Sequence, residues 1–117
     1  MDRRTPMDVE ALTAEAWRLS QLLDKGVTAL RDAAVAYARA EHEYRERKAM
    51  AYLETESGTV AEREAHTYAL VGAFRRDRDL ADAARLAALE AIRSRRAQIS
   101  AIQSLINAYK AEAELSR

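Results

Sequence analysis

The sequence has no cysteine, one proline and three glycines among its 117 residues. The lack of cysteine excludes disulfide bonds, thiolate metal ligands and a cysteine nucleophile. The scarcity of proline and glycine argues against a β-sheet protein, because strands are joined by turns that need such residues. Strong helix formers, chiefly alanine, leucine, glutamate and arginine, fill the other positions. The composition therefore predicts an all-α protein.

Long apolar runs are also missing. No run approaches the ~20 residues of a membrane-spanning helix, and residues 1–4 are not followed by the apolar core of a signal peptide. We therefore expect a soluble, cytoplasmic protein with no membrane partner. Acidic and basic residues balance at 19 each, whereas a dedicated nucleic-acid binder usually has a basic excess. Acidic and basic residues are not evenly distributed along the chain, because residues 91–111 contain four basic residues and no acidic one.

Two helices are predicted in the first half of the chain. Thr5 can act as an N-cap, and Pro6 suits the first helical position. Gly26 predicts a break or a kink, because glycine weakens a helix interior. We therefore expect one helix over about residues 6–24 and a second over about 27–57, with a single bent helix as the alternative.

A turn at Ser57–Thr59 is expected to separate these helices from a third one. Gly58 suits the left-handed conformation that ends many helices, and Thr59 begins a capping box with Glu62. The sequence beyond this turn predicts one uninterrupted helix over about residues 60–115. At 1.5 Å per residue, that helix would be roughly 80 Å long.

Apolar residues recur at helical spacing along all three predicted helices. The stripes consist of Val9, Leu12, Ala16, Leu19 and Leu23, then Leu30, Tyr37, Tyr44 and Ala51, then Leu89, Ile92, Ile99, Ile102, Ile106, Tyr109 and Ala113. Such stripes favour lengthwise packing at a shallow crossing angle. We expect residues 1–117 to form one domain, an elongated, coiled-coil-like antiparallel helical hairpin with two shorter helices packed along one long C-terminal helix.

A hairpin of this kind has a thin core, so parts of its apolar stripes should remain uncovered. Helices with uncovered apolar seams usually oligomerise. We therefore predict a homo-oligomer that forms through the first helix and the C-terminal half of the third. The predicted interface residues are Leu12, Leu19, Ile99, Ile102, Ile106 and Tyr109. Trp17 is expected to be a buried anchor of the first helix, with a role at a partner interface as the alternative.

The sequence offers little for catalysis. His42 and His66 lie on either side of the Gly58 turn, about 24 and 12 Å from it along their helices, so we do not expect them to meet. No Glu-x-x-His pair repeats in the way a di-iron helical bundle requires. We therefore predict no catalytic residue, no metal site, no cofactor and no enzymatic activity.

Two groups of basic residues are candidates for nucleic-acid binding. They are Arg45, Arg47 and Lys48 in the second predicted helix, and Arg93, Arg95, Arg96 and Lys110 in the third. Their cationic side chains can contact phosphates without reading a base sequence, and the tyrosines at 37, 44, 52 and 109 could stack on unpaired bases. The alternative is a solvated helix face, with the tyrosines packed between helices. The polar run at residues 75–79 is expected to be an exposed, salt-bridged part of the third helix.

Two stretches carry a family resemblance. Residues 91–103 read AIRSRRAQISAIQ, and residues 44–49 read YRERKA ahead of Ser57 and Gly58. The first is similar to the C-terminal segment of the UvsY-type recombination mediators of tailed bacteriophages, which has an Ala-Ile-x-Ser-Arg core followed by an isoleucine stripe. The second resembles that family's basic helix, which runs into a Ser-Gly turn. One departure is that the family's basic helix is richer in lysine, whereas glutamates dilute the charge here.

The resemblance implies a homo-oligomeric ring that binds single-stranded DNA and has no catalysis of its own. Such a mediator helps to load a RecA-like recombinase onto DNA covered by single-strand-binding protein. By the same resemblance, Arg45, Arg47 and Lys48 would contact the sugar–phosphate backbone. The residues implied to join subunits are Ile99, Ile102, Ile106 and Tyr109, while Arg93, Arg95 and Arg96 could serve either purpose.

Two other functions are compatible with an all-helical chain. The main alternative is a phage structural or scaffold-type module that binds proteins and does not bind nucleic acid. A secreted helical hairpin of the WXG type fits less well, because that family has Trp-x-Gly at its turn. Here the turn is Ser57–Thr59, and Trp17 is far from it in the sequence.

Overall fold

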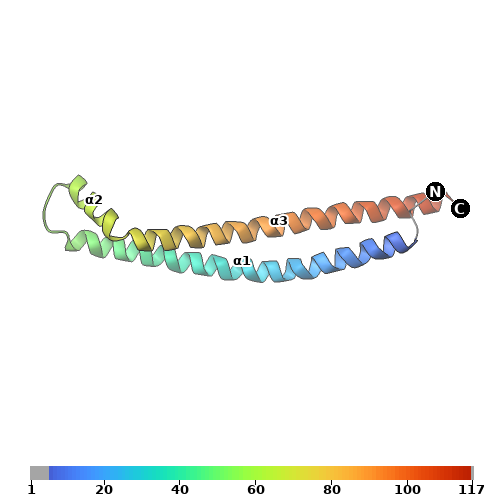
Figure 1. Ribbon diagram of the computed structural model, residues 1–117, viewed down its shortest axis with the longest axis horizontal. Helices are drawn as coiled ribbons and strands as arrows, with labels where there is room; N and C mark the ends of the chain where they lie inside the picture. Colours follow the sequence, from blue (N-terminus) through green and yellow to red (C-terminus); the bar gives the residue numbers. More distant parts are fainter. Residues whose placement is uncertain (1–5, 117) are drawn as a thin grey trace. The chain divides into compact units, whose positions relative to one another are not determined.

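The computed structural model describes residues 6–116. These residues form three helices, α1 (Pro6–Glu54), α2 (Val60–Leu70) and α3 (Gly72–Leu115), and no strand (Figure 1). The all-α prediction is therefore confirmed. The predicted N-cap, Thr5, lies outside the described residues. None of the helices in this part of the chain is long and apolar enough to cross a membrane.

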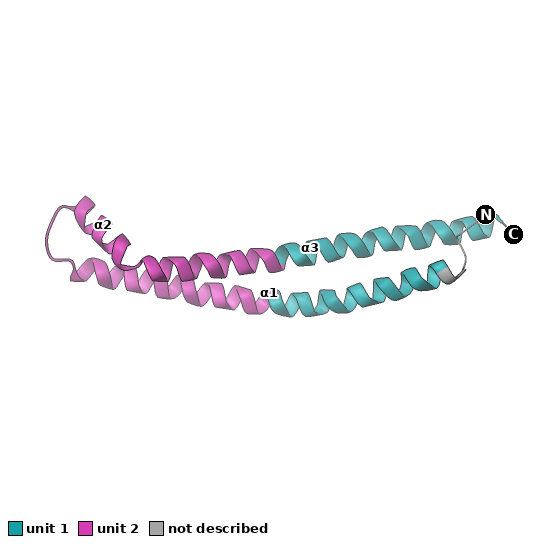
Figure 2. Ribbon diagram, in the orientation of Figure 1, with its two compact units in different colours: residues 1–29, 89–117 teal, residues 30–88 magenta. Residues whose placement is uncertain are grey.

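The chain divides into two compact units (Figure 2). Unit 1 contains the chain up to Ala29 and from Leu89 onward, and unit 2 contains Leu30–Ala88. In unit 1, the first half of α1 lies beside the second half of α3, and the start of α1 lies near the end of α3 (Figure 2). Unit 2 holds the remainder of α1 and α3 with α2 between them in the sequence. Antiparallel helix pairing is therefore present within each unit.

Helix α1 continues through Gly26, so the predicted break at this residue is wrong. A Cβ atom added at Gly26 would lie 3.4 Å from Cγ1 of Ile92 on α3, which is itself buried. The glycine therefore allows the isoleucine side chain to pack close to the backbone of α1. Its cost of about 1 kcal/mol within a helix is small beside the contribution of the helix formers around it.

The predicted turn after α1 is confirmed. Gly58 has a φ of 104°, the left-handed conformation that glycine adopts without strain. Thr59 is the N-cap of α2, where its Oγ1 accepts a hydrogen bond of 3.2 Å from the backbone N–H of Glu62. A Cβ atom added at Gly58 would lie only 2.9 Å from Oε2 of Glu62, so this carboxylate folds back over the turn.

The predicted continuous helix over residues 60–115 is wrong, because the chain leaves helical geometry at Val71. Val71 has φ −99° and ψ 14° and is only 2% exposed. It joins Tyr44 and Ala51 in the core of unit 2, with Phe74 packed against them. The bend turns α2 away from the axis of α3 (Figure 1) and buries Val71, which contributes about 1.5–3 kcal/mol. Gly72, directly after it, is the sequence signal for this break.

The predicted apolar faces are confirmed within unit 1 except at Ala113, which is exposed. Leu19, Ile92 and Ile106 are buried, and the other stripe residues described there are half-buried, namely Val9, Leu12, Ala16, Leu23, Leu89, Ile99, Ile102 and Tyr109. Trp17 behaves differently, because 67% of it is exposed. The expectation that Trp17 is a buried anchor is therefore wrong.

Candidate nucleic-acid interface

In unit 2, the structure places the predicted cluster Arg45, Arg47 and Lys48 on the exposed surface of α1. The side chains of Arg45 and Arg47 are 76% and 52% exposed. Arg45 donates a 2.8 Å hydrogen bond from Nε to Oε1 of Glu41, and Arg47 Nη2 lies 4.0 Å from a carboxylate oxygen of Glu43. Both partners are one turn earlier on the same helix, so these cations are exposed but already paired.

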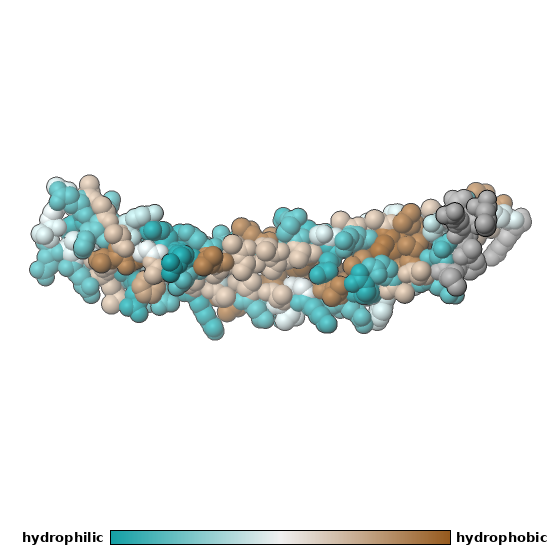
Figure 3. Space-filling model, in the orientation of Figure 1, coloured by the Kyte–Doolittle hydropathy of each residue, from teal (hydrophilic) through white to brown (hydrophobic). Residues whose placement is uncertain are grey.

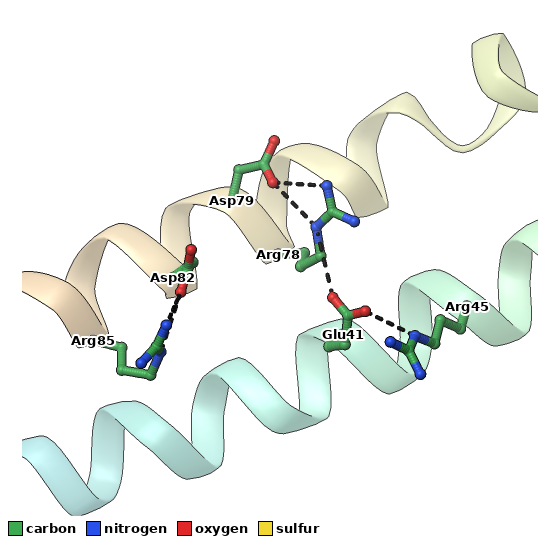
Figure 4. A network of polar contacts seen from close by, with 6 residues as sticks. All are labelled: Glu41, Arg45, Arg78, Asp79, Asp82 and Arg85. Carbon is green, nitrogen blue, oxygen red and sulfur yellow. Dashed lines mark hydrogen bonds and ion pairs between the residues drawn. The ribbon is translucent and has the colours of Figure 1, made fainter.

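Glu41 also connects α1 to α3 (Figure 4). Its second oxygen lies 3.7 Å from Nε of Arg78, and Arg78 donates to Oδ1 of Asp79 at 2.9 and 3.1 Å. The hydrogen bond with Asp79 raises the pKa of the Arg78 guanidinium, which therefore stays charged at any ordinary pH. The same guanidinium lies 4.4 Å from the centre of the Tyr44 ring. Because Arg78 has these contacts within unit 2, the expectation that its whole run is exposed is only partly met.

A second arginine on α3 repeats this arrangement one heptad later. Arg85 donates to Oδ1 of Asp82 at 2.6 Å (Figure 4), and its guanidinium lies 5.0 Å from the centre of the Tyr37 ring. Tyr37 and Tyr44 are thus packed between helices, as the alternative to base stacking predicted. Sequence reasoning missed the partner arginines. The matching seven-residue spacing of the two tyrosines and the two arginines was the available signal.

An open groove of about 720 Å³ lies between the last turns of α1 and helix α2 in unit 2. Its lining residues are Arg45, Lys48, Ala49, Tyr52, Leu53, Glu64, Thr67 and Tyr68. The groove therefore brings two of the predicted basic residues together with one predicted stacking residue, Tyr52. Sequence reasoning missed Thr67 and Tyr68, because their position beside α1 depends on the bend at Val71.

The second predicted basic group lies on α3 within unit 1. Arg93, Arg96 and Lys110 are exposed and Arg95 is half-buried. Nη1 of Arg93 lies 3.8 Å from Oε2 of Glu90, on the same helix. These side chains are accessible to a ligand.

The six residues predicted to join subunits all belong to unit 1, where they are buried or half-buried. Leu19 and Ile106 are only 4% and 5% exposed in the single chain, so they can offer little surface to a second copy. The remaining four are half-buried, namely Leu12, Ile99, Ile102 and Tyr109. The large apolar side chains that are exposed in unit 1 are instead Trp17, Val27, Leu105 and Leu115. Hydrophobic residues are interspersed with hydrophilic ones on the visible surface (Figure 3).

Within residues 6–116, no group of three or more histidine, cysteine, aspartate or glutamate side chains could hold a metal ion. His42 Nε2 lies 3.5 Å from a carboxylate oxygen of Glu46 on the same helix. Comparison with models of known protein families, with curated proteins and with solved structures gives no match for this chain.

Proposed function

We propose that the protein is a non-catalytic recombination mediator that binds single-stranded DNA and helps to load a RecA-like recombinase onto it. The proposal places the protein in the cytoplasm of a bacterial host, encoded by a tailed phage or a prophage. It includes single-strand-binding protein as a further partner. The observation that carries the proposal is the exposed cluster of Arg45, Arg47 and Lys48 on one stretch of α1.

The existing ion pairs of this cluster are compatible with DNA binding. Exposed pairs one turn apart on a helix contribute only about 0.3–0.5 kcal/mol. A phosphate group can therefore replace Glu41 beside Arg45, or Glu43 beside Arg47, at a small cost in free energy. Because the chain has no net charge, each site should bind weakly and be sensitive to salt.

Self-association would compensate for weak individual sites, because several sites on one strand add through effective concentration. We propose that the protein is a homo-oligomer, as the resemblance implies for a ring. Since Leu19 and Ile106 are buried within unit 1, the exposed Trp17 and Leu105 are better candidates for the contact between copies. The exposed Arg93, Arg96 and Lys110 on α3 are proposed as additional phosphate contacts.

Replacing Arg45, Arg47 and Lys48 with alanine tests the proposal. We expect weaker binding to single-stranded oligonucleotides of any sequence, because phosphate contacts do not read bases. The slope of log affinity against log salt should fall by about 2 in magnitude, since each phosphate contact on a single strand contributes ~0.7. Fluorescence anisotropy over a range of salt concentrations measures both quantities.

A matched control removes the same number of charges elsewhere on α1. Lys25, Arg31 and Arg39 are also exposed, so their replacement with alanine changes the net charge equally. The two triple variants should differ in DNA affinity if the cluster binds DNA. Equal affinities would mean that only the net charge matters, and the cluster would have no specific role.

The second candidate function is a helical module that binds proteins and has no role with nucleic acid. The observation that favours it is the exposure of large apolar residues, of which Trp17, Leu53 and Leu115 are the most exposed. This function predicts no salt-sensitive affinity for DNA. The same anisotropy titration of the unmodified protein therefore separates the two functions.

A further inference from the structure

The groove of unit 2 combines apolar walls with basic residues. Ala49, Leu53 and two tyrosines supply apolar surface, while Arg45 and Lys48 supply positive charge. The single acidic residue in the lining is Glu64. A ligand that matches this groove has a flat apolar part and an attached negative group.

The two tyrosines of the groove are each fixed by an arginine. Arg63 lies over the ring of Tyr52, 4.3 Å from its centre, and donates a 3.0 Å hydrogen bond to the carbonyl oxygen of Tyr52. Arg75 lies over the ring of Tyr68 at 3.5 Å and donates a 3.2 Å hydrogen bond to the carbonyl oxygen of Tyr68. Each arginine thus donates to a carbonyl in the last turn of a helix, although the carbonyl of Tyr52 also accepts a 3.3 Å hydrogen bond from the N–H of Thr55.

This arrangement prepares an aromatic surface for stacking. Tyr68 remains 56% exposed although Arg75 covers one face of its ring. A ring that is already held in place loses little conformational entropy when a ligand stacks on it. The adjacent guanidinium also adds positive charge beside the ring, which favours a ligand that carries phosphate.

Thr67 is a buried polar residue at the base of the groove. It lines the groove and is only 1% exposed, and its Oγ1 has no hydrogen-bond partner within the described part of the chain. Buried hydroxyl groups are normally paired, since an unpaired one costs about 1–3 kcal/mol. Its oxygen has almost no accessible surface, so a ligand in the groove would reach it only after a local rearrangement.

We infer that this groove binds an unpaired nucleobase of single-stranded DNA, which stacks on Tyr68 while the adjoining phosphates contact Arg45 and Lys48. The inference rests on the proposed function and specifies where the preference for single strands originates. In a duplex, both faces of each base are already stacked, so a base cannot enter the groove without disrupting the helix. The carboxylate of Glu64 can accept a hydrogen bond from an N–H group of the base, such as N3–H of thymine.

Replacing Tyr68 with leucine or phenylalanine tests the inference in the full-length chain. Leucine retains apolar volume but removes the ring, whereas phenylalanine retains the ring. The variants are titrated against two single-stranded oligonucleotides of equal length, one of thymidines and one in which the same positions are abasic. The two probes have equal numbers of phosphates, so the difference in their affinities reports base contacts alone.

We expect the unmodified protein and Tyr68→Phe to bind the thymidine probe more tightly than the abasic one. Stacking on an aromatic ring predicts a difference of roughly 5- to 150-fold for one base. Tyr68→Leu should lose most of this difference and bind the abasic probe as the unmodified protein does. Leu70→Ala, an equally exposed position on α2 outside the groove lining, is the control and should leave both affinities unchanged.

The outcomes separate the inference from the function on which it rests. If the unmodified protein binds single strands and Tyr68→Leu retains the full preference for bases, the inference is overturned but the proposed function stands. The groove would then be assigned to a different ligand, such as a protein segment. If the unmodified protein binds neither probe at low salt, both the function and the inference fail. Circular dichroism verifies that each variant retains its helix content.

Discussion

Arginine side chains in unit 2 have two distinct environments. Arg78 and Arg85 lie over tyrosine rings and also pair with aspartates of their own helix, so they stabilise the packing of α3 against α1. Arg45 and Arg47 are instead exposed and pair with carboxylates on α1, and Arg47 also lies 5.1 Å from the centre of the Phe74 ring on α3. Arg78 and Arg85 are therefore engaged within the fold, whereas Arg45 and Arg47 can exchange their carboxylate partners for a phosphate.

Glu41 is the residue at which these two environments meet, because it pairs with both Arg45 and Arg78. We predict that Glu41→Gln increases affinity for single-stranded DNA about 2- to 5-fold, since Arg45 no longer has a competing carboxylate. The free energy of unfolding should fall by less than about 1 kcal/mol through the weakened pair with Arg78. Anisotropy and urea denaturation measure the two effects.

Glu10→Gln provides the control, because Glu10 is an exposed residue of α1 in unit 1 and its replacement alters the net charge equally. An equal gain in affinity for both variants would show that Glu41 has no special influence on Arg45.

The burial of single residues could be predicted from the spacing of apolar residues, because that spacing shows which face of the helix packs against another helix. Leu19 and Tyr44 lie on the predicted stripes and are buried. Trp17 was predicted from its size and hydrophobicity, but it follows Ala16, and successive helix residues point about 100° apart. Position on the helix therefore outweighs residue type, and Trp17 is exposed.

At the scale of helices, the turn between α1 and α2 follows directly from local chemistry. Gly58 and Thr59 satisfy the conformational and hydrogen-bonding needs of the two helix ends, so both were identifiable from the sequence. The strong helix formers around Gly26 keep α1 continuous there, whereas the end of α2 at Val71 depends on packing against Tyr44 of another helix. Such tertiary contacts override local propensity.

Two glycine-to-alanine substitutions should have opposite effects on stability. Gly58→Ala should destabilise the protein by about 1–2 kcal/mol, because Gly58 has a positive φ and an added Cβ would crowd Glu62. Gly72→Ala should stabilise it by about 0.4–1 kcal/mol, since Gly72 lies in α3 and an added Cβ would meet no atom closer than 3.7 Å.

Urea denaturation of the two glycine variants and the unmodified protein measures these differences. A destabilising effect of Gly72→Ala would contradict the helical role of that residue. An unchanged stability for Gly58→Ala would contradict the conformation of the turn.

The candidate site was predictable only in part, because some of its residues are brought together by tertiary contacts. Arg45, Lys48 and Tyr52 were recognisable because they share one stretch of α1. Tyr68 and Thr67 lie beside them only because the chain bends at Val71, and that bend depends on the core of unit 2. The groove therefore depends on tertiary packing, and its lining residues form no continuous motif in the sequence.

For the whole molecule, the equal numbers of acidic and basic residues set the expected strength of binding. With 19 of each, long-range attraction to a polyanion is absent, so affinity must come from local clusters and from self-association. We predict that Trp17→Ala weakens self-association about 5-fold or more, because an exposed tryptophan is a frequent anchor of protein interfaces.

Size-exclusion chromatography with light scattering over a range of protein concentrations measures self-association. Leu80→Ala, which removes an exposed apolar side chain of unit 2, is the control and should have little effect. Because Trp17 is the only tryptophan, its fluorescence should also shift to shorter wavelength as copies associate. A monomer at all micromolar concentrations would contradict the predicted oligomer.

The proposed binding of single-stranded DNA through the exposed basic residues underlies the other predictions. It is tested most directly by anisotropy titrations of the unmodified protein against a labelled single-stranded oligonucleotide and the same sequence as duplex, at low and at physiological salt. We predict tighter binding to the single strand, with an affinity that falls steeply as salt increases. No binding to the single strand at low salt would contradict the claim and favour a protein-binding module instead.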